Sequence, residues 1–127
     1  MQNSHLYESI GGAEAVRSIV DLFIDEIENR PGVDHLRDLY KNVDMTVYRE
    51  RLFEFLCGWL GGPALYTQRH GIPMLRENHR SIPINDSAAD EWMTCMKAAL
   101  DKAVYDHSVH LKIEGALMRM AESLKNS

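Results

Sequence analysis

The chain has 127 residues, of which 45% are apolar and 26% are charged, a composition typical of one globular domain spanning residues 1–127. Nineteen acidic residues against fourteen Lys and Arg give a net charge of −5, and no basic run is present. These features argue against nucleic acid or an anionic membrane surface as a partner. No apolar run reaches 18 residues, so the sequence predicts no membrane span.

The first nine residues are polar and lack the basic start and apolar centre of a signal peptide. Cys57 and Cys95 both fall inside segments with helical patterning. We interpret them as reduced thiols in the core and expect a cytoplasmic protein.

The first strong pattern predicts a helix over residues 13–27, preceded by Gly11-Gly12 and ended by Pro31-Gly32. Its apolar residues recur at helical spacings of three and four: Val16, Ile19, Val20, Phe23, Ile24 and Ile27. A short helical piece is expected over residues 33–40. Thr46 is the expected N-cap of a helix over residues 47–60, which Gly61-Gly62-Pro63 stops.

The next 25 residues contain only fragments of helix. Residues 64–71 read as turn and helical fragment, Pro73 opens a short helix ending near His79, and Pro83 excludes a continuous helix over residues 81–86. Two long helices, over residues 86–104 and 108–124, complete an all-α domain of four substantial helices. Such a long, weakly structured connection inside a compact domain is often functional.

Two groups of histidines deserve comparison as ligands. His107 and His110 lie three apart on one helix face, but no third metal ligand is suggested nearby, so we interpret them as surface residues. His79 follows Leu75 by four residues, so both side chains can face the interior. Its ring could coordinate iron through one nitrogen while the other donates to a backbone carbonyl. From these residues alone an ordinary interior or surface histidine is the default, and a cofactor ligand is the alternative.

Three motifs occur together in order: "LYESIGG", "FLCGWLGGPALYTQRHGIPMLRENH" and "DEWMTCMKAAL". In this combination the chain resembles group II truncated haemoglobins from about Leu6 to Ser123. The resemblance implies a truncated globin, a two-over-two helical sandwich around haem b (iron protoporphyrin IX). It also implies a pentacoordinate iron with His79 as its proximal ligand.

The resemblance further implies an apolar haem pocket with hydrogen-bond donors for a bound ligand. Trp92 matches the pocket tryptophan and is expected to be the main donor, with the hydroxyls of Tyr40 and Tyr48 as further donors. The expected pocket residues are Phe23, Ile24, Tyr40, Tyr48, Leu52, Phe55, Leu75, His79, Ile84 and Trp92.

Two positions depart from the family pattern. Ile24 stands where the family usually has a tyrosine whose hydroxyl touches the ligand, and Ile82 stands where an aromatic residue usually follows the histidine. The sequence therefore leaves open how the pocket compensates for Ile24, and whether ferric iron takes water or Tyr48 as its sixth ligand.

The leading functional expectation is binding of a diatomic ligand, oxygen or nitric oxide, by a monomer or weak homodimer. The alternative is a redox enzyme, a nitric oxide dioxygenase or a weak peroxidase, that uses an external reductase. No distal histidine or carboxylate is evident, which argues against an efficient peroxidase. A third reading is a helical module that has lost haem and binds protein partners.

Overall fold

The computed structural model describes residues 5–126, and all regular structure within that range is helical. The helices are α1 (Leu6–Ile10), α2 (Ala13–Asn29), α3 (Asp34–Leu39), α4 (Met45–Trp59), α5 (Leu65–His70), α6 (Leu75–His79), α7 (Asp86–Ala103) and α8 (His107–Ser123). The predicted all-α class is confirmed. None of these helices is long and apolar enough to cross a membrane.

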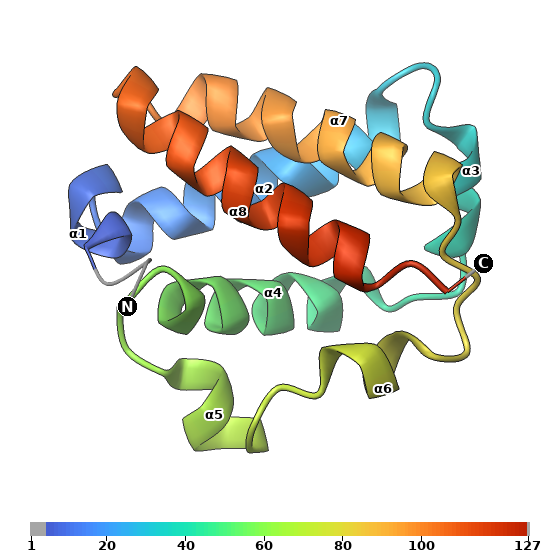
Figure 1. Cartoon of the computed structure of the whole chain (residues 1–127), viewed down its shortest axis with the longest axis horizontal. Helices are drawn as coiled ribbons and strands as arrows, with labels where there is room; N and C mark the ends of the chain where they lie inside the picture. The colour runs from blue at the N-terminus through green and yellow to red at the C-terminus, as the bar shows by residue number, and fades with distance from the viewer. Residues whose placement is uncertain (1–4, 127) are drawn as a thin grey trace.

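The four long helices form two packed pairs. Helix α2 packs on α4 and α7 packs on α8, while the most extensive contact joins the pairs through α2 and α7 (Figure 1). The apolar stripe predicted for α2 is buried along its whole length. Cys57 and Cys95 are free thiols buried in the same core, and burial raises the pKa of Cys95 to about 11. The predicted two-over-two helical sandwich is confirmed.

Aspartate side chains set the starts of two long helices. Asp44 Oδ1 accepts hydrogen bonds from the backbone N–H groups of Thr46 and Val47, at 3.0 and 3.3 Å. The prediction of Thr46 as the N-cap was therefore wrong, and α4 begins two residues earlier than expected. Asp106 caps α8 in the same way. A carboxylate at the N-cap satisfies free N–H groups and also interacts favourably with the positive end of the helix dipole.

Helix α1 was not expected from the sequence pattern. The backbone N–H of Tyr7 donates to the carbonyl of Leu60 at 2.8 Å, so α1 is fastened to the end of α4. Gly11 ends α1 with a φ of 114°, a left-handed conformation that glycine adopts without a steric penalty. A five-residue helix of this kind depends on tertiary contacts, which periodicity does not register.

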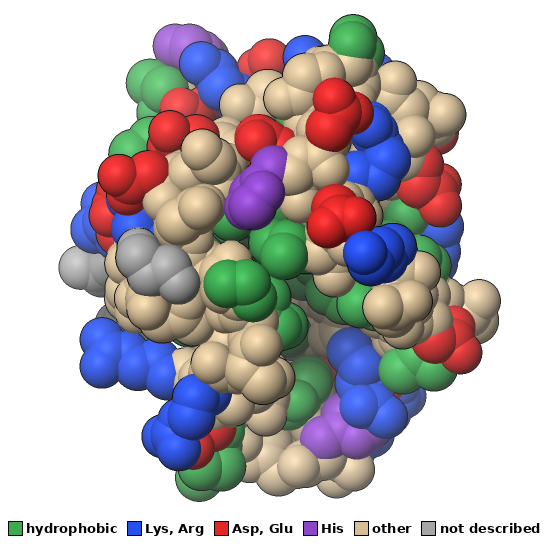
Figure 2. Space-filling view, turned by 90° about the vertical axis from the view of Figure 1, so that its right-hand side faces the viewer, with side chains coloured by type: hydrophobic (Ala, Val, Ile, Leu, Met, Phe, Trp, Pro, Cys, Tyr) green, Lys and Arg blue, Asp and Glu red, His purple; other side chains and the backbone are tan. Residues whose placement is uncertain are grey.

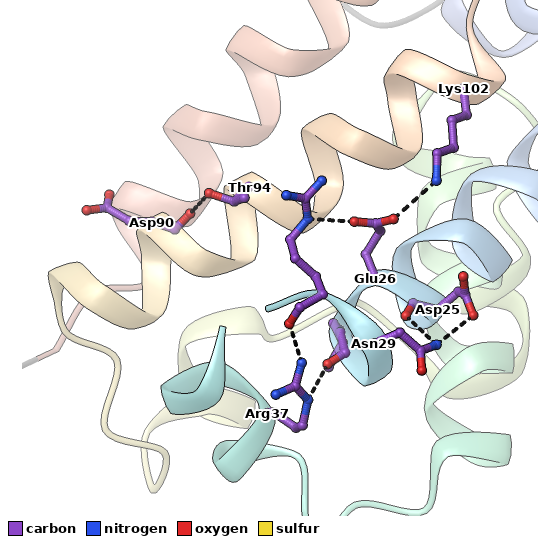
Figure 3. Close-up of polar contacts among 9 residues, drawn as sticks. Asp25, Glu26, Asn29, Arg37, Asp90, Thr94 and Lys102 are labelled. Atoms are coloured by element: carbon purple, nitrogen blue, oxygen red, sulfur yellow. Dashed lines mark hydrogen bonds and ion pairs between the residues drawn. The ribbon is translucent and has the colours of Figure 1, made fainter. Parts of the chain in front are cut away.

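The corner between α2 and α3 is held by charged side chains (Figure 3). Arg37 of α3 donates to the carbonyl of Ile27 at 2.8 Å and to that of Arg30 at 2.5 Å. These carbonyls belong to the end of α2, where the helix leaves them without internal partners. Arg30 and Lys102 in turn donate to the carboxylate of Glu26, which ties the corner to α7. The network fixes α3 and, with it, the position of Tyr40 at the C-cap of that helix.

Candidate functional site

A cavity of about 380 Å³ lies between α3, α4, α5, α6, α7 and the end of α8. Figure 2 shows a hollow near the middle of one face of the molecule, with hydrophobic side chains in and around it. The volume is in the range of small-molecule and cofactor sites. Eight of the ten expected pocket residues line it: Tyr40, Tyr48, Leu52, Phe55, Leu75, His79, Ile84 and Trp92.

The other two expected residues, Phe23 and Ile24, are not among the lining residues and are fully buried in the core. The ring of Phe23 meets that of Trp92 edge to face, with centroids 5.2 Å apart. Phe23 therefore supports the indole from within the core. Ile24, the next residue of α2, fills space in the core and has no polar group to offer a ligand.

The ring of His79 is oriented by its own helix. Its Nδ1 lies 2.7 Å from the carbonyl oxygen of Leu75, one turn earlier. A carbonyl only accepts, so Nδ1 carries the proton and donates, and Nε2 of the neutral ring is left with a free lone pair. This is the tautomer that a metal-binding histidine adopts when a backbone carbonyl holds its other nitrogen. One imidazole supplies one ligand, so a metal here needs its remaining ligands from a prosthetic group.

The segment after His79 is clamped from the other end of the chain. Asn126 Nδ2 donates to the carbonyls of His79 and Ile82, at 3.2 and 2.9 Å, and its Oδ1 accepts from the backbone N–H of Ile84 at 2.8 Å. Sequence reasoning missed Asn126, because the contact joins residues more than 40 positions apart. In the sequence, Asn126 stands out only as a polar residue shortly after Leu124, the last apolar residue of the predicted helix.

Tyr40 and Tyr48 form a polar pair in the mostly apolar cavity. The hydroxyls of Tyr40 and Tyr48 lie 2.8 Å apart, with ring centroids 5.0 Å apart. Burial raises the pKa of both phenols, and hydrogen bonding with Trp92 partly offsets this by lowering each pKa. Both tyrosines are therefore neutral near pH 7. One O–H is used within the pair, which leaves the other O–H and the indole N–H of Trp92 as donors.

Several lining residues were not expected from the sequence. They come from α3 and the turn after it, from the start of α7 and from the end of α8: Leu36, Leu39, Val43, Ala88, Ala89, Met120, Ala121 and Leu124. Met120 and Leu124 are apolar residues within the helix predicted over residues 108–124, and this could have signalled them. Arg51 is the only Lys or Arg among the lining residues that the structure describes, and its side chain is exposed.

The other histidines have different surroundings. Nε2 of His70 lies 2.8 Å from the buried carboxylate of Glu54, and that of the buried His110 lies 2.9 Å from Glu114. The interpretation of His110 as a surface residue was therefore wrong, whereas His107 is exposed. Across residues 5–126, no three His, Cys, Asp or Glu side chains come together in a way that could hold a metal ion. His79 is the histidine that lines the large cavity.

Comparison with known proteins agrees with this geometry. The model of the bacterial-like globins matches residues 5–126. A group 2 truncated hemoglobin of Bacillus subtilis is 35% identical over 120 residues, covering 94% of this chain and 87% of that protein. The chain therefore belongs to the bacterial-like globin family.

Comparison with solved structures shows which group of globins the chain resembles. A group II 2-on-2 hemoglobin of Agrobacterium tumefaciens superposes with a TM-score of 0.91 at 31% identity, covering 95% of this chain and 93% of that one. A truncated hemoglobin of Pseudoalteromonas haloplanktis gives a TM-score of 0.91 at 32% identity, covering 96% and 98%. The resemblance to group II truncated haemoglobins, predicted from three motifs, is confirmed.

Proposed function

We propose that the cavity binds haem b with His79 as the proximal iron ligand, and that the protein binds oxygen or nitric oxide at the iron. Globin membership implies haem and a gas ligand, and the observation that carries the assignment to His79 is its hydrogen bond to Leu75. That bond leaves Nε2 free in a cavity whose lining is mostly apolar. Burying the flat apolar macrocycle in such a cavity is favourable.

Arg51 completes the fit to the prosthetic group. Haem carries two propionate carboxylates, and Arg51 places a guanidinium at the cavity while remaining exposed. A guanidinium binds carboxylates through paired hydrogen bonds, so Arg51 would hold one propionate at the cavity mouth.

Ferrous haem iron supplies reversible binding of diatomic gases, and the side chains of the cavity decide how firmly a ligand is held. With Ile24 in the core, the donors that remain are Trp92 and the free hydroxyl of the Tyr40–Tyr48 pair. The indole is the more defined donor, because Phe23 supports its ring and its N–H cannot rotate away. We therefore assign Trp92 as the main donor to the ligand.

The iron is expected to be pentacoordinate in the ferrous state. The hydroxyl of Tyr48 already lies 2.8 Å from that of Tyr40, which disfavours its use as an iron ligand, so water is the expected sixth ligand of the ferric protein. Apart from His79, the described lining holds no imidazole or carboxylate that could act as a peroxidase acid–base group. Reversible gas binding is thus favoured over peroxidase chemistry, and any redox turnover needs an external reductase.

The test is the optical spectrum of the protein after expression with haem supply. We expect an intense Soret band, a ferric form without phenolate charge-transfer bands, and a ferrous form that shifts on adding carbon monoxide. A protein that folds with the helical content of the structure but takes up no haem would contradict the proposal and would favour a helical binding module.

A further inference from the structure

The surface formed by the end of α5, the α5–α6 loop and α6 differs in charge from the rest of the chain. Residues 69–80 hold three arginines and one glutamate, which give a net charge of +2. The remaining eleven Lys and Arg and eighteen Asp and Glu of the chain give −7. On the face drawn in Figure 2, the charged side chains of the lower part are mainly Lys and Arg, whereas the upper part carries most of the acidic side chains together with further Lys and Arg. Figure 1 places α5 and α6 along the lower edge of the molecule. We call residues 69–80 the α5–α6 surface.

Two large apolar side chains stand out at the centre of the α5–α6 surface. Ile72 is 80% exposed and Met74 is 58% exposed. Arg69 and Arg80 flank them and pair with Glu54 and Glu77. An exposed apolar pair with a cationic rim has the composition of a small, transient protein interface.

Arg76 carries the uncompensated charge of this surface. Its side chain is exposed and makes no ion pair within residues 5–126. A partner that docks here therefore gains most from carboxylates placed opposite Arg76. The negative remainder of the chain repels the same carboxylates elsewhere, so the charge pattern orients an acidic partner toward this surface.

The α5–α6 surface is also connected to His79 over a short path. Met74 immediately precedes Leu75, and the carbonyl of Leu75 accepts the hydrogen bond from Nδ1 of His79 at 2.7 Å. An exposed side chain is thus separated from the proposed iron ligand by one residue and one hydrogen bond. A redox centre held against Met74 would face the proximal side of the site.

We propose that the α5–α6 surface docks an acidic one-electron carrier whose flavin or iron–sulfur cluster is exposed at its own surface. The inference rests on the proposed function, because it requires iron at His79. In the docked complex the carrier's reduced centre loses one electron and ferric iron is reduced to ferrous. His79 keeps its proton on Nδ1, so no proton transfer accompanies this step.

The experiment measures binding by isothermal titration calorimetry between the haem-loaded ferric protein and two purified acidic probes, an oxidised flavodoxin and a [2Fe–2S] ferredoxin. The Soret band is checked first, so loss of haem binding, which would overturn both proposals, is seen separately. We expect Arg76→Glu to weaken binding of at least one probe about tenfold at low salt, and added salt to weaken wild-type binding. Which probe responds distinguishes a flavin from a cluster as the partner's centre.

Matched variants separate this surface from general charge effects. Lys112→Glu makes the same charge change at an exposed position on α8 and should leave binding within about twofold of wild type. The double variant Ile72→Ser and Met74→Ser should weaken binding without changing the Soret band, and a basic c-type cytochrome should not bind the surface. Equal affinities for Arg76→Glu and Lys112→Glu, or no binding of either acidic probe to a haem-loaded protein, would overturn the proposal.

Discussion

Trp92 combines two environments in one side chain. Its ring packs edge to face on Phe23 in the core, and the same residue lines the cavity together with Tyr40 and Tyr48. This arrangement gives the pocket a fixed donor without a tyrosine at position 24. Under the proposed function, the indole would link core packing directly to ligand binding.

Replacing Trp92 by phenylalanine keeps an aromatic ring beside Phe23 and removes the N–H donor. We expect the oxygen dissociation rate to rise about fivefold to tenfold, since a net hydrogen bond contributes on the order of 1 kcal/mol. Stopped-flow measurement of oxygen release checks this. Trp59→Phe is the control, because Trp59 does not line the cavity and the rate should stay as in wild type. An unchanged rate in Trp92→Phe would remove Trp92 as the ligand donor.

The Tyr40–Tyr48 pair predicts a dependence of stability on alkaline pH. Burial raises the native pKa of Tyr48 above its unfolded value, so the native state binds more protons than the unfolded state above about pH 10. This contribution is complete below the unfolded pKa and is lost as pH rises through the native pKa. The free energy of unfolding should therefore fall with a slope of up to about 1.4 kcal/mol per pH unit from this group.

Urea unfolding at pH 8, 10 and 11 measures that slope. In Tyr48→Phe the fall should be shallower, because phenylalanine has no proton to lose. Tyr105→Phe, at a side chain that is 93% exposed, should keep the wild-type slope. Identical slopes in all three proteins would show that the buried hydroxyl does not resist ionisation.

At the scale of helices, the junction of α1 and α4 depends on a glycine. A Cβ added at Gly62 would lie 2.5 Å from Cδ1 of Tyr7, near the root of that ring, where the side chain cannot swing away. The φ of Gly62 is not positive, so a larger residue is excluded there by lack of space and not by backbone conformation. The close approach lets α1 pack beside the turn that follows α4.

Gly62→Ala should lower the free energy of unfolding by about 1–3 kcal/mol, the usual cost of overpacking. Gly115→Ala is the matched control in the middle of α8, where the nearest atom outside the helix backbone is 3.6 Å from the added Cβ. It should stabilise the protein by about 0.5–1 kcal/mol, because alanine has the higher helix propensity. Equal effects of the two substitutions in chemical denaturation would contradict the proposed contact.

The sequence predicted a helix well where its apolar stripe was long. It predicted helices and their ends less well where tertiary contacts determine them. The periodicity of α2 and α7 located both helices to within two residues at each end. Thr46 was chosen as a cap because it precedes the apolar pattern, whereas Asp44 accepts two N–H bonds and extends α4 backward. Local propensity does not reveal which of two neighbouring side chains reaches the free N–H groups.

At the scale of the whole molecule, the cavity is assembled from six helices, α3 to α8, which together span most of the sequence. The i, i+4 spacing of Leu75 and His79 was readable from the sequence, and so were Trp92 and the pocket face of α4. Asn126 and Met120 were not assigned to the site, because their place depends on how the end of α8 returns to α6. Phe23 and Ile24 are absent from the lining because both are fully buried in the core, where Phe23 meets the ring of Trp92.

Haem bound in the apolar cavity, as proposed, should stabilise the whole fold. A ligand that binds only the folded state stabilises it by mass action, so removing haem should lower Tm and raise it again on reconstitution. Calorimetry of the loaded, extracted and reconstituted protein checks this. An extracted protein that melts at the same temperature as the loaded one would show that haem does not fill the cavity between the helices.

The central claim is that His79 holds the iron, and the optical spectrum of His79→Gly tests it most directly. We predict that this variant loses the wild-type ferrous and carbonyl spectra, and that added imidazole restores them by occupying the vacated position. His35→Ala, at an exposed histidine of α3, should keep the wild-type spectra. Unchanged ferrous and carbonyl spectra in His79→Gly without imidazole would contradict the account.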